Sequence, residues 1–405
     1  MKVCLLVDDY LPSSTKVGAK MMHELAVELM SRGHAVSVIA PQPNLRSKLH
    51  ISSMDGVTVC RFASGELKNI SKLRRAINES LLPYHAWRSL RKYLHQNPHD
   101  LVVYYSPTIF WGVFVSWLKY LWGARSYLIL RDFFPQWVID RGILKSWSPI
   151  TKYFRLIETI NYRAADTIGL QSPANIEVFR RMSRIKRPLE VLYNWSLPVN
   201  TTDNPGTVYR ERLGLGDKVV FFYGGNIGAA QDMMNIARLA FSLRNDDRVH
   251  FLLVGSGDEF ELLQTAISEG KAGNMTLLPA VSQSEYFDIL SEIDVGLFSL
   301  HRSHTAHNFP GKILGYMAYA KPILGSINPQ NDLKGLVEGG EAGFVCPNGD
   351  DEALLDRALY FLDNPSMRTS MGENAKRILS DTFSVSRAAN QIIMAASIED
   401  ANLTM

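Results

Sequence analysis

Apolar runs of strand length alternate with segments of helical periodicity along most of this 405-residue chain. The runs in the first half are 2–7, 35–40, 58–62, 101–105, 126–130, 167–170 and 188–192. Those in the second half are 219–223, 250–254, 275–278, 295–299, 322–326 and 343–345. This alternation is typical of parallel α/β sheets, whose crossover helices cover both faces. We therefore predict an α/β fold of two doubly wound domains that face a cleft, with ligands beyond the strand ends.

A segment rich in Pro, Asn, Thr and Gly separates the two series of runs. It covers residues 195–207 and has the composition of an interdomain linker. The predicted domains are therefore 1–194 and 208–383, and a last helix is expected within 384–405.

Two segments of the second domain favour the binding of an anion. In FFYGGNIGAAQD, which starts at residue 221, Gly224, Gly225 and Gly228 lead into an amphipathic helical segment. The second segment is HNFPGKILGYMAYAKPILGS, which starts at residue 307. In it, Asn308 is the expected N-cap of a helix and Lys312 the expected phosphate contact. Helix starts offer unpaired N–H groups and a positive dipole end, so the two segments predict one diphosphate held from two sides. A nucleotide-sugar donor carries such a diphosphate.

Charge is divided unevenly between the halves of the chain. Residues 1–200 contain 27 Lys and Arg against 14 Asp and Glu, whereas the remainder contains 16 against 26. All seven tryptophans also lie in the first half. A basic, tryptophan-rich domain indicates contact with an anionic surface. Because no aromatic and basic nucleic-acid motif is present, we expect an anionic membrane leaflet and no nucleic acid.

The clearest basic stretch is residues 68–92, in which seven Lys and Arg are spaced among Leu and Trp87. Either it is an ordinary solvated helix face or it docks on anionic lipid. The apolar stretch 108–122 is too short to span a bilayer and contains Lys119. We expect it to be a core-facing helix, with a partly membrane-facing helix as the alternative.

The cysteines and the first residues indicate a reducing compartment. Cys4, Cys60 and Cys346 form no CxxC pair and no even framework, which is typical of free thiols. The chain reaches Asp8 and Asp9 after a short apolar run, unlike a signal peptide. We expect a cytoplasmic protein that is peripheral at the inner face of the cytoplasmic membrane.

At this level of detail the chain resembles glycosyltransferase family 4. The segments DDYLPSSTKVGAKMMHELA, FFYGGNIG, FLLVGSGDEFELL, LLPAVSQSEYFDILSEIDVGLFSL and FPGKILGYMAYAKPIL follow the family's order and spacing. The opening segment is most similar to bacterial O-antigen and surface-polysaccharide L-fucosamine transferases. The resemblance implies a GT-B fold of two Rossmann-like domains, with the last helix packed back on the first domain.

The resemblance also implies which residues hold a UDP-sugar donor. Its diphosphate is expected at Asn226, Gly228 and Lys312, and its base beside Val281. The further donor contacts expected on this basis are Gly225, His307, Asn308 and Phe309. Lys16 and Gly18, in the first loop, are expected near the transferred sugar and the acceptor. The expected acceptor is a polyprenyl-diphosphate-linked saccharide.

This chain departs from the family at the positions of a glutamate pair. The family carries two glutamates with seven residues between them, and the second binds the donor ribose; His307 and Gly315 stand there in this chain. Neither residue is a carboxylate, so Gly315 cannot bind the ribose in this way, and what replaces the glutamate pair stays open. Retention and inversion of the anomeric configuration both stay open.

The catalytic candidates follow the strand at 126–130, where Arg131 and Asp132 replace the histidine of many family members. A carboxylate at the carboxyl end of a strand is placed to take a proton from an acceptor hydroxyl. The alternative is that Asp132 caps the next turn or pairs with Arg131.

The sequence predicts no metal and no cofactor. His301, His304 and His307 have a spacing that matches no zinc motif, and no cysteine or carboxylate cluster accompanies them. Two other functions remain open: a UDP-sugar epimerase of the same architecture, and a sugar-nucleotide-binding protein without catalysis.

Overall fold

The computed structural model describes residues 1–12, 14, 17–67, 70–140, 142–197, 208–270, 272–302, 309–328 and 331–397. The chain divides into two compact units. Unit 1 consists of Met1–Asn194 together with the C-terminal stretch from Val385, and unit 2 of Trp195–Ser384.

Unit 1 is built on an eight-stranded sheet with the order β3-β4-β2-β1-β5-β6-β7-β8. The strands are β1 (Lys2–Leu6), β2 (Ala35–Pro43), β3 (Leu49–Met54), β4 (Val57–Ser64), β5 (Leu101–Ser106), β6 (Arg125–Leu130), β7 (Thr167–Leu170) and β8 (Leu189–Val191). The seven runs predicted for the first half are all strands. Strand β3 was not predicted; it is antiparallel to β4, whereas the other neighbours in the sheet are parallel.

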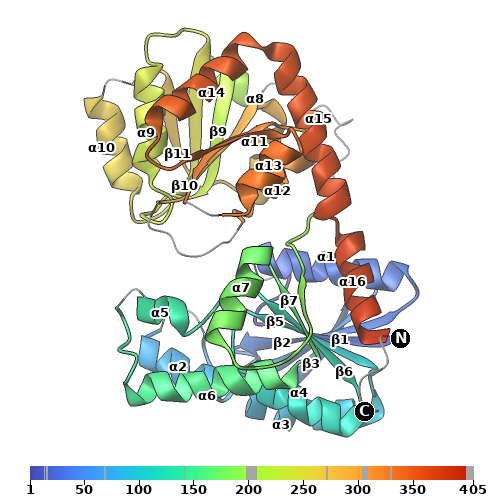
Figure 1. The fold of residues 1–405 in the computed structure, drawn as a ribbon. Helices are drawn as coiled ribbons and strands as arrows, with labels where there is room; N and C mark the ends of the chain where they lie inside the picture. The colour runs from blue at the N-terminus through green and yellow to red at the C-terminus, as the bar shows by residue number, and fades with distance from the viewer. Residues whose placement is uncertain are drawn as a thin grey trace. The chain divides into compact units, whose positions relative to one another are not determined.

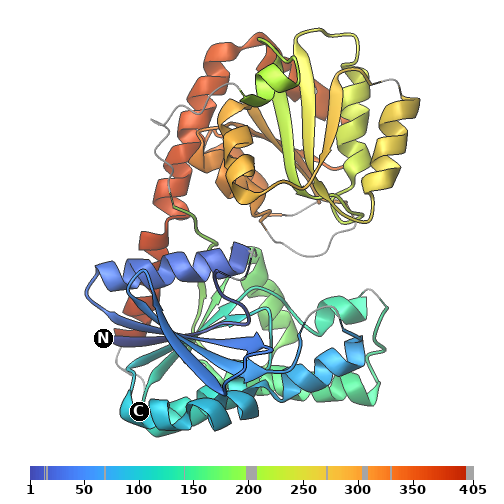
Figure 2. The same cartoon turned by 180° about the vertical axis from the view of Figure 1, so that it is seen from behind.

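Helices cover both faces of this sheet (Figures 1 and 2). They are α1 (Val17–Ser31), α2 (Lys72–Ser80), α3 (Leu82–Gln96), α4 (Trp111–Trp122), α5 (Gln136–Asp140), α6 (Pro149–Ala164), α7 (Pro173–Met182) and α16 (Val385–Ser397). Helices α1 and α16 pack together on one face, while α3 and α4 lie on the other. The C-terminal helix α16 therefore belongs to unit 1, where Arg32, directly after α1, donates hydrogen bonds to Ser386 and Asn390.

The predicted core-facing helix at 108–122 is confirmed as α4. Its residues Trp111, Phe114, Val115 and Leu118 are fully buried in the core of unit 1. Gly123 ends the helix in the left-handed conformation with φ +66°, which glycine adopts without strain. Among the described residues, no helix is long and apolar enough to cross a membrane.

Unit 2 is built on a six-stranded parallel sheet with the order β11-β10-β9-β12-β13-β14. Its strands are β9 (Val219–Asn226), β10 (Val249–Ser256), β11 (Met275–Pro279), β12 (Val295–Ser299), β13 (Ile323–Ile327) and β14 (Gly343–Pro347). Its helices are α8 (Val208–Arg212), α9 (Met233–Ser242), α10 (Phe260–Glu269), α11 (Gln283–Glu292), α12 (Lys312–Ala318), α13 (Leu333–Gly339), α14 (Asp351–Asp363) and α15 (Pro365–Thr382). The six strands predicted for the second half are all present.

The strand order of unit 2 fixes where a ligand can bind. Strand β9 lies between β10 and β12, so the chain leaves it toward one side and returns on the other. In doubly wound sheets this topological switch point opens a crevice at the carboxyl ends of the strands. Residues Gly224, Gly225 and Asn226 end β9 there.

Candidate functional site

The end of β9 and the start of α12 bring Gly225 and Lys312 together. Gly225 has φ +132°, a conformation that side chains rarely adopt. A Cβ atom on Gly225 would lie 3.4 Å from Cε and 3.6 Å from Nζ of Lys312. The bare strand end and the lysine therefore form one surface, as the sequence predicted.

Lys312 carries a cation that has no counter-charge among the described residues. Its Nζ lies 3.5 Å from the ring centroid of Tyr223, and none of the described carboxylates is within ion-pair distance of it. Burial lowers its pKa well below the usual value of 10.5. An ammonium group held in this way can donate charge-assisted hydrogen bonds to a phosphate.

The second predicted anion site, at the start of the helix after β9, is already occupied by the chain itself. Helix α9 begins at Met233, and the carboxylate of Glu259 accepts a hydrogen bond from the Met233 N–H. Asp232 is the N-cap residue and Asp258 lies beside Gly228. Three carboxylates therefore surround this helix start and repel an anion, so the prediction that two helix starts hold one diphosphate is wrong.

The start of α12 also differs from the prediction. Gly311 is its N-cap residue and Lys312 its first residue, so the prediction that Asn308 caps this helix is wrong. The reason is Pro310, which disfavours helical backbone in the residue before it. Phe309 is buried and packs edge-on against Phe383 at 6.2 Å, so its ring belongs to the core. His307 and Asn308 lie outside the described residues.

The remaining donor candidates lie around the same strand ends. Asn226 is exposed, and its Nδ2 donates to Oε1 of Gln231 at 2.6 Å. Val281 is half-buried and directly precedes α11, which begins with the predicted capping box of Ser282 and Glu285. Asn226 and Val281 therefore border the crevice on the β9 and β11 sides.

The GSG sequence at 255–257 packs against the loop after β9. A Cβ atom on Gly257 would collide with the backbone of Ile227, and one on Gly255 with the carbonyl of Gly225. The Ile227 N–H also donates to the Ser256 carbonyl at 3.0 Å. These glycines therefore allow the close packing that holds the strand end in place. In the sequence, only the close spacing of Gly255 and Gly257 indicated this role.

In unit 1, Arg131 and Asp132 follow β6 and lie next to the end of β5. Arg131 continues the ladder by donating its N–H to the Ser106 carbonyl at 3.2 Å, and its guanidinium donates to the Tyr193 carbonyl at 3.3 Å. Burial lowers the pKa of Arg131 to about 10. Because this cation is anchored below the surface, it serves as a fixed positive charge beside Asp132.

Asp132 is half-buried, and burial raises the pKa of its carboxyl above 3.8. The Arg131 guanidinium opposes this rise, whereas the Asp8 carboxylate adds to it. Arg131 and Asp132 form no direct ion pair or hydrogen bond with each other. A carboxyl group with a raised pKa and no hydrogen-bonded cation has the properties of a general base.

The structure places Gly18 differently from the prediction. It is the second residue of α1 and so belongs to a helix, because helical residues begin directly after Lys16. A Cβ atom on Gly18 would lie 2.9 Å from the hydroxyl of Tyr105, which is at the end of β5. Lys16 lies outside the described residues. Gly18 therefore makes room for a tyrosine beside the Asp132 carboxyl.

Arg131 and Asp132 lie close to Asp8 and Tyr105, two residues that sequence reasoning missed. Burial raises the pKa of Tyr105 to about 12, with opposing effects from Arg131 and from the carboxylates of Asp8 and Asp132. These four groups follow or end the neighbouring strands β1, β5 and β6. The sequence could have indicated both residues, because they lie at the ends of predicted strands that are neighbours in the sheet.

Metal ligands do not gather in the described part of the chain. No group of three or more His, Cys, Asp or Glu side chains is arranged to hold an ion there. His301 is described, whereas His304 and His307 lie outside the described residues.

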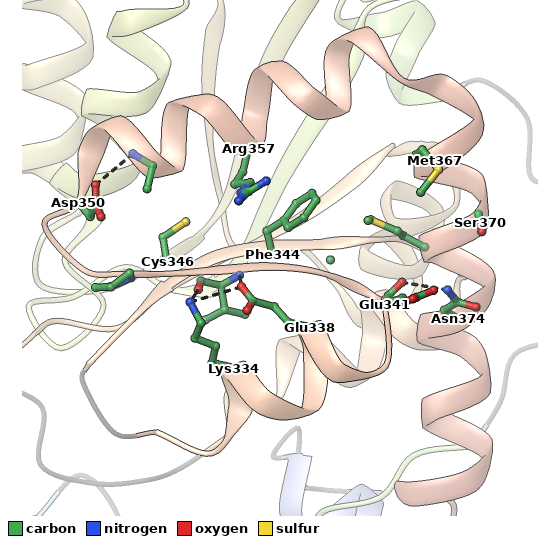
Figure 3. Close-up of a pocket in the computed structure, with 15 residues that line it drawn as sticks. Lys334, Glu338, Glu341, Phe344, Cys346, Asp350, Arg357, Met367, Ser370 and Asn374 are labelled. Carbon is green, nitrogen blue, oxygen red and sulfur yellow. Dashed lines mark hydrogen bonds and ion pairs between the residues drawn. The ribbon is translucent and has the colours of Figure 1, made fainter.

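A pocket of unit 2, about 550 Å³, lies at the open edge of β14 and not at the switch point (Figure 3). The Val345 N–H donates to Oε1 of Glu338 at 3.0 Å, and Nζ of Lys334 donates to the Val345 carbonyl at 3.1 Å. Side chains of α13 therefore occupy the hydrogen-bonding groups of an edge strand. This arrangement protects the edge against pairing with another strand, so the pocket has a structural explanation.

Two family models match the chain. One, described as a glycosyl transferase 4-like domain, matches residues 18–195, and the other, glycosyl transferases group 1, matches residues 217–364. Together they cover the greater part of both units.

Among curated proteins, the chain is 24% identical over 402 residues to a protein of Escherichia coli K12 named "Putative colanic acid biosynthesis glycosyl transferase WcaI". That match covers 94% of this chain and 96% of WcaI. It is 25% identical over 242 residues to "Probable glycosyltransferase WbjE" of Pseudomonas aeruginosa, covering 58% of this chain and 60% of that protein. Among solved structures, Anabaena HepE in complex with UDP is similar with a TM-score of 0.68 at 17% identity, over 98% of this chain and all of HepE.

Proposed function

We propose that this chain, which matches a glycosyl transferase 4-like domain followed by a group 1 domain, transfers a sugar from a UDP-sugar to a lipid-linked saccharide in polysaccharide synthesis. The observation that carries the donor class is Lys312, a cation without a counter-charge among the described residues, beside the bare strand end at Gly225. HepE, which shares the fold, is described with UDP bound. For the sugar we propose N-acetyl-L-fucosamine, on the resemblance of the opening segment to L-fucosamine transferases.

In the proposed reaction the diphosphate of the donor contacts Lys312 and backbone at Gly225 and Asn226, and the base lies beside Val281. Asp132 takes the proton from the acceptor hydroxyl. Arg131 keeps a positive charge close to this carboxylate and thereby limits the rise of its pKa. The proposed role of Asp132 as the base is supported by its half-buried position after β6 and by the direction of its pKa shift.

Release of UDP tests this proposal. The full chain is incubated with a panel of UDP-sugars, with and without a synthetic polyprenyl-diphosphate-GlcNAc. We expect release that depends on the acceptor and is fastest with UDP-N-acetyl-L-fucosamine. Acceptor-dependent release with a different donor would correct the sugar alone. UDP binding without release across the panel would contradict transfer to this class of acceptor.

We further propose that α2 contacts an anionic membrane. On α2 the apolar side chains of Leu73 and Ile77 are 67% and 52% exposed, beside the exposed Arg74 and Arg75. On α3, by contrast, the leucines face the core, although Tyr84 is 52% exposed on the same helix as the exposed basic side chains. Apolar and basic groups exposed on one short helix suit the interface of an anionic bilayer.

Flotation with liposomes tests the membrane contact. We expect binding that requires anionic lipid, weakens with salt, and is reduced by Leu73→Ser combined with Ile77→Ser. Leu262→Ser, at a leucine 55% exposed on α10 of unit 2, is the matched control and should leave binding unchanged. Equal binding to neutral vesicles would overturn the electrostatic part of this proposal.

A further inference from the structure

Three tyrosines of unit 2 lie close together beside the end of β9, and their hydroxyls are engaged differently. The Tyr223 hydroxyl donates to the Asn226 carbonyl at 2.5 Å. The Tyr316 hydroxyl donates to the Leu297 carbonyl at 2.9 Å. The Tyr286 hydroxyl has no hydrogen-bond partner among the described residues, although burial raises its pKa. The Tyr286 side chain is half-buried, so its hydroxyl is open to a ligand.

The position of the Tyr286 ring is set by two glycines. The ring lies so close to Gly224 in β9 that a Cβ atom there would collide with it, and it packs against Phe222 with ring centroids 5.7 Å apart. On the α12 side, a Cβ atom on Gly315 would lie 4.0 Å from the Tyr286 hydroxyl. Both the strand and the helix therefore leave space around this one side chain.

The hydroxyl lies between the two ends of the donor site that we propose above. Tyr286 belongs to α11, which begins directly after Val281 at the base end. Its ring touches the strand end that carries Gly225, which adjoins Lys312 at the diphosphate end. In a nucleotide the ribose joins the base to the diphosphate, so a group between these two ends faces the ribose.

We propose that the Tyr286 hydroxyl hydrogen-bonds to a ribose hydroxyl of the donor nucleotide. This inference rests on the proposed UDP-sugar function and names the residue that recognises the ribose. A phenol both donates and accepts a hydrogen bond, which matches a ribose hydroxyl. Gly315 contributes by leaving the space beside the Tyr286 hydroxyl free of a side chain.

Calorimetric titration with UDP and with 2′,3′-dideoxy-UDP, which lacks both ribose hydroxyls, tests the inference. The wild-type chain should bind UDP about five- to tenfold more tightly than the dideoxy compound, the effect of one hydrogen bond. Tyr286→Phe keeps the ring and should reduce this ratio to about one by weakening UDP only. Gly224→Ala displaces the ring and should reduce the ratio similarly.

Tyr319→Phe is the matched control, because the Tyr319 ring stacks on Phe287, the next residue of α11. It should leave the preference for UDP unchanged. An unchanged preference in Tyr286→Phe would overturn this inference and leave the proposed function intact. A wild-type chain that binds neither compound would overturn the proposed donor class and this inference with it.

Discussion

The two units share the strand order at the centre of their sheets, but different groups lie beside the first strand of each sheet. In unit 1 the ends of β1, β5 and β6 gather Asp8, Asp132 and Tyr105 around the anchored Arg131. In unit 2 the end of β9 carries bare glycine backbone, with Lys312 beside it. The first arrangement suits proton transfer from a hydroxyl, and the second suits a phosphate.

The difference shows that the sheet decides where a ligand binds, whereas the first residues after each strand decide its chemistry. In both units the first strand of the sheet lies between the second strand and a strand from later in the sequence. The residues that follow these strands have no such similarity. Substitutions at the strand ends of unit 1 should therefore affect proton transfer, and those in unit 2 should affect phosphate binding.

The largest effect is expected at Asp132. Asp132→Asn removes the proposed base and should reduce turnover by about two or more decades, the range of general base catalysis. UDP affinity should stay within about twofold, since the donor contacts are in unit 2. Turnover and UDP titration measure the two effects, and unchanged turnover would contradict the assignment.

The pH dependence of the wild-type enzyme provides a second measurement on this carboxyl. Burial raises the pKa of Asp132 above 3.8, so its basic form is lost at a higher pH than for an exposed aspartate. Turnover should therefore decrease as the pH falls through this raised pKa. In Asp132→Asn the acidic limb of the profile should disappear from the residual rate.

A smaller effect is expected at Lys312. Lys312→Met removes a charge-assisted contact and should weaken UDP binding about ten- to a hundredfold. The melting temperature should stay the same or rise, because a buried charge without a counter-charge is lost. Lys334→Met, which removes a lysine at the protected edge of β14, is the control that should retain UDP affinity.

The same lysine gives unit 2 a pH dependence of opposite sign. Burial lowers the pKa of Lys312 below 10.5, so the free protein loses this positive charge as the pH rises through the lowered value. UDP affinity should therefore decrease with rising pH, beginning below 10.5. Lys312→Arg, which stays charged, should flatten this decrease in the titrations.

The sequence predicted the strands well for a physical reason. Strands buried on both faces are continuous apolar runs, and these runs mark β1 and β9 directly. Strand β3 lies at the sheet edge, where most of its side chains keep some contact with solvent, so it lacks such a run.

The site was less predictable, because its details depend on contacts between distant segments. The glycine pattern before α9 indicated an anion, but Glu259, from the end of the next strand and its loop, occupies that helix start. Tyr286 occupies an apolar position of α11, and only its contacts with Gly224 and Gly315 distinguish it from a core residue. Lys312 was chosen from its place at an expected helix start and from the family resemblance, and its contact with a phosphate stays a prediction.

The smallest effect is expected at Gly18 of unit 1, which packs against Tyr105. Gly18→Ala places a Cβ atom 2.9 Å from the Tyr105 hydroxyl, so helix α1 or the tyrosine must shift, at a cost of about 1 kcal/mol. Tyr105→Phe removes the nearest obstructing atom but leaves Cε1 at 3.0 Å, so the double variant should recover only part of the melting temperature.

Gly335→Ala is the matched control, since Gly335 in α13 has open space around it and alanine favours a helix. That variant should be at least as stable as the wild type. If Gly18→Ala were equally harmless, Tyr105 would be free to move, and the carboxylates of unit 1 would lack the fixed neighbour that distinguishes them from the strand end of unit 2.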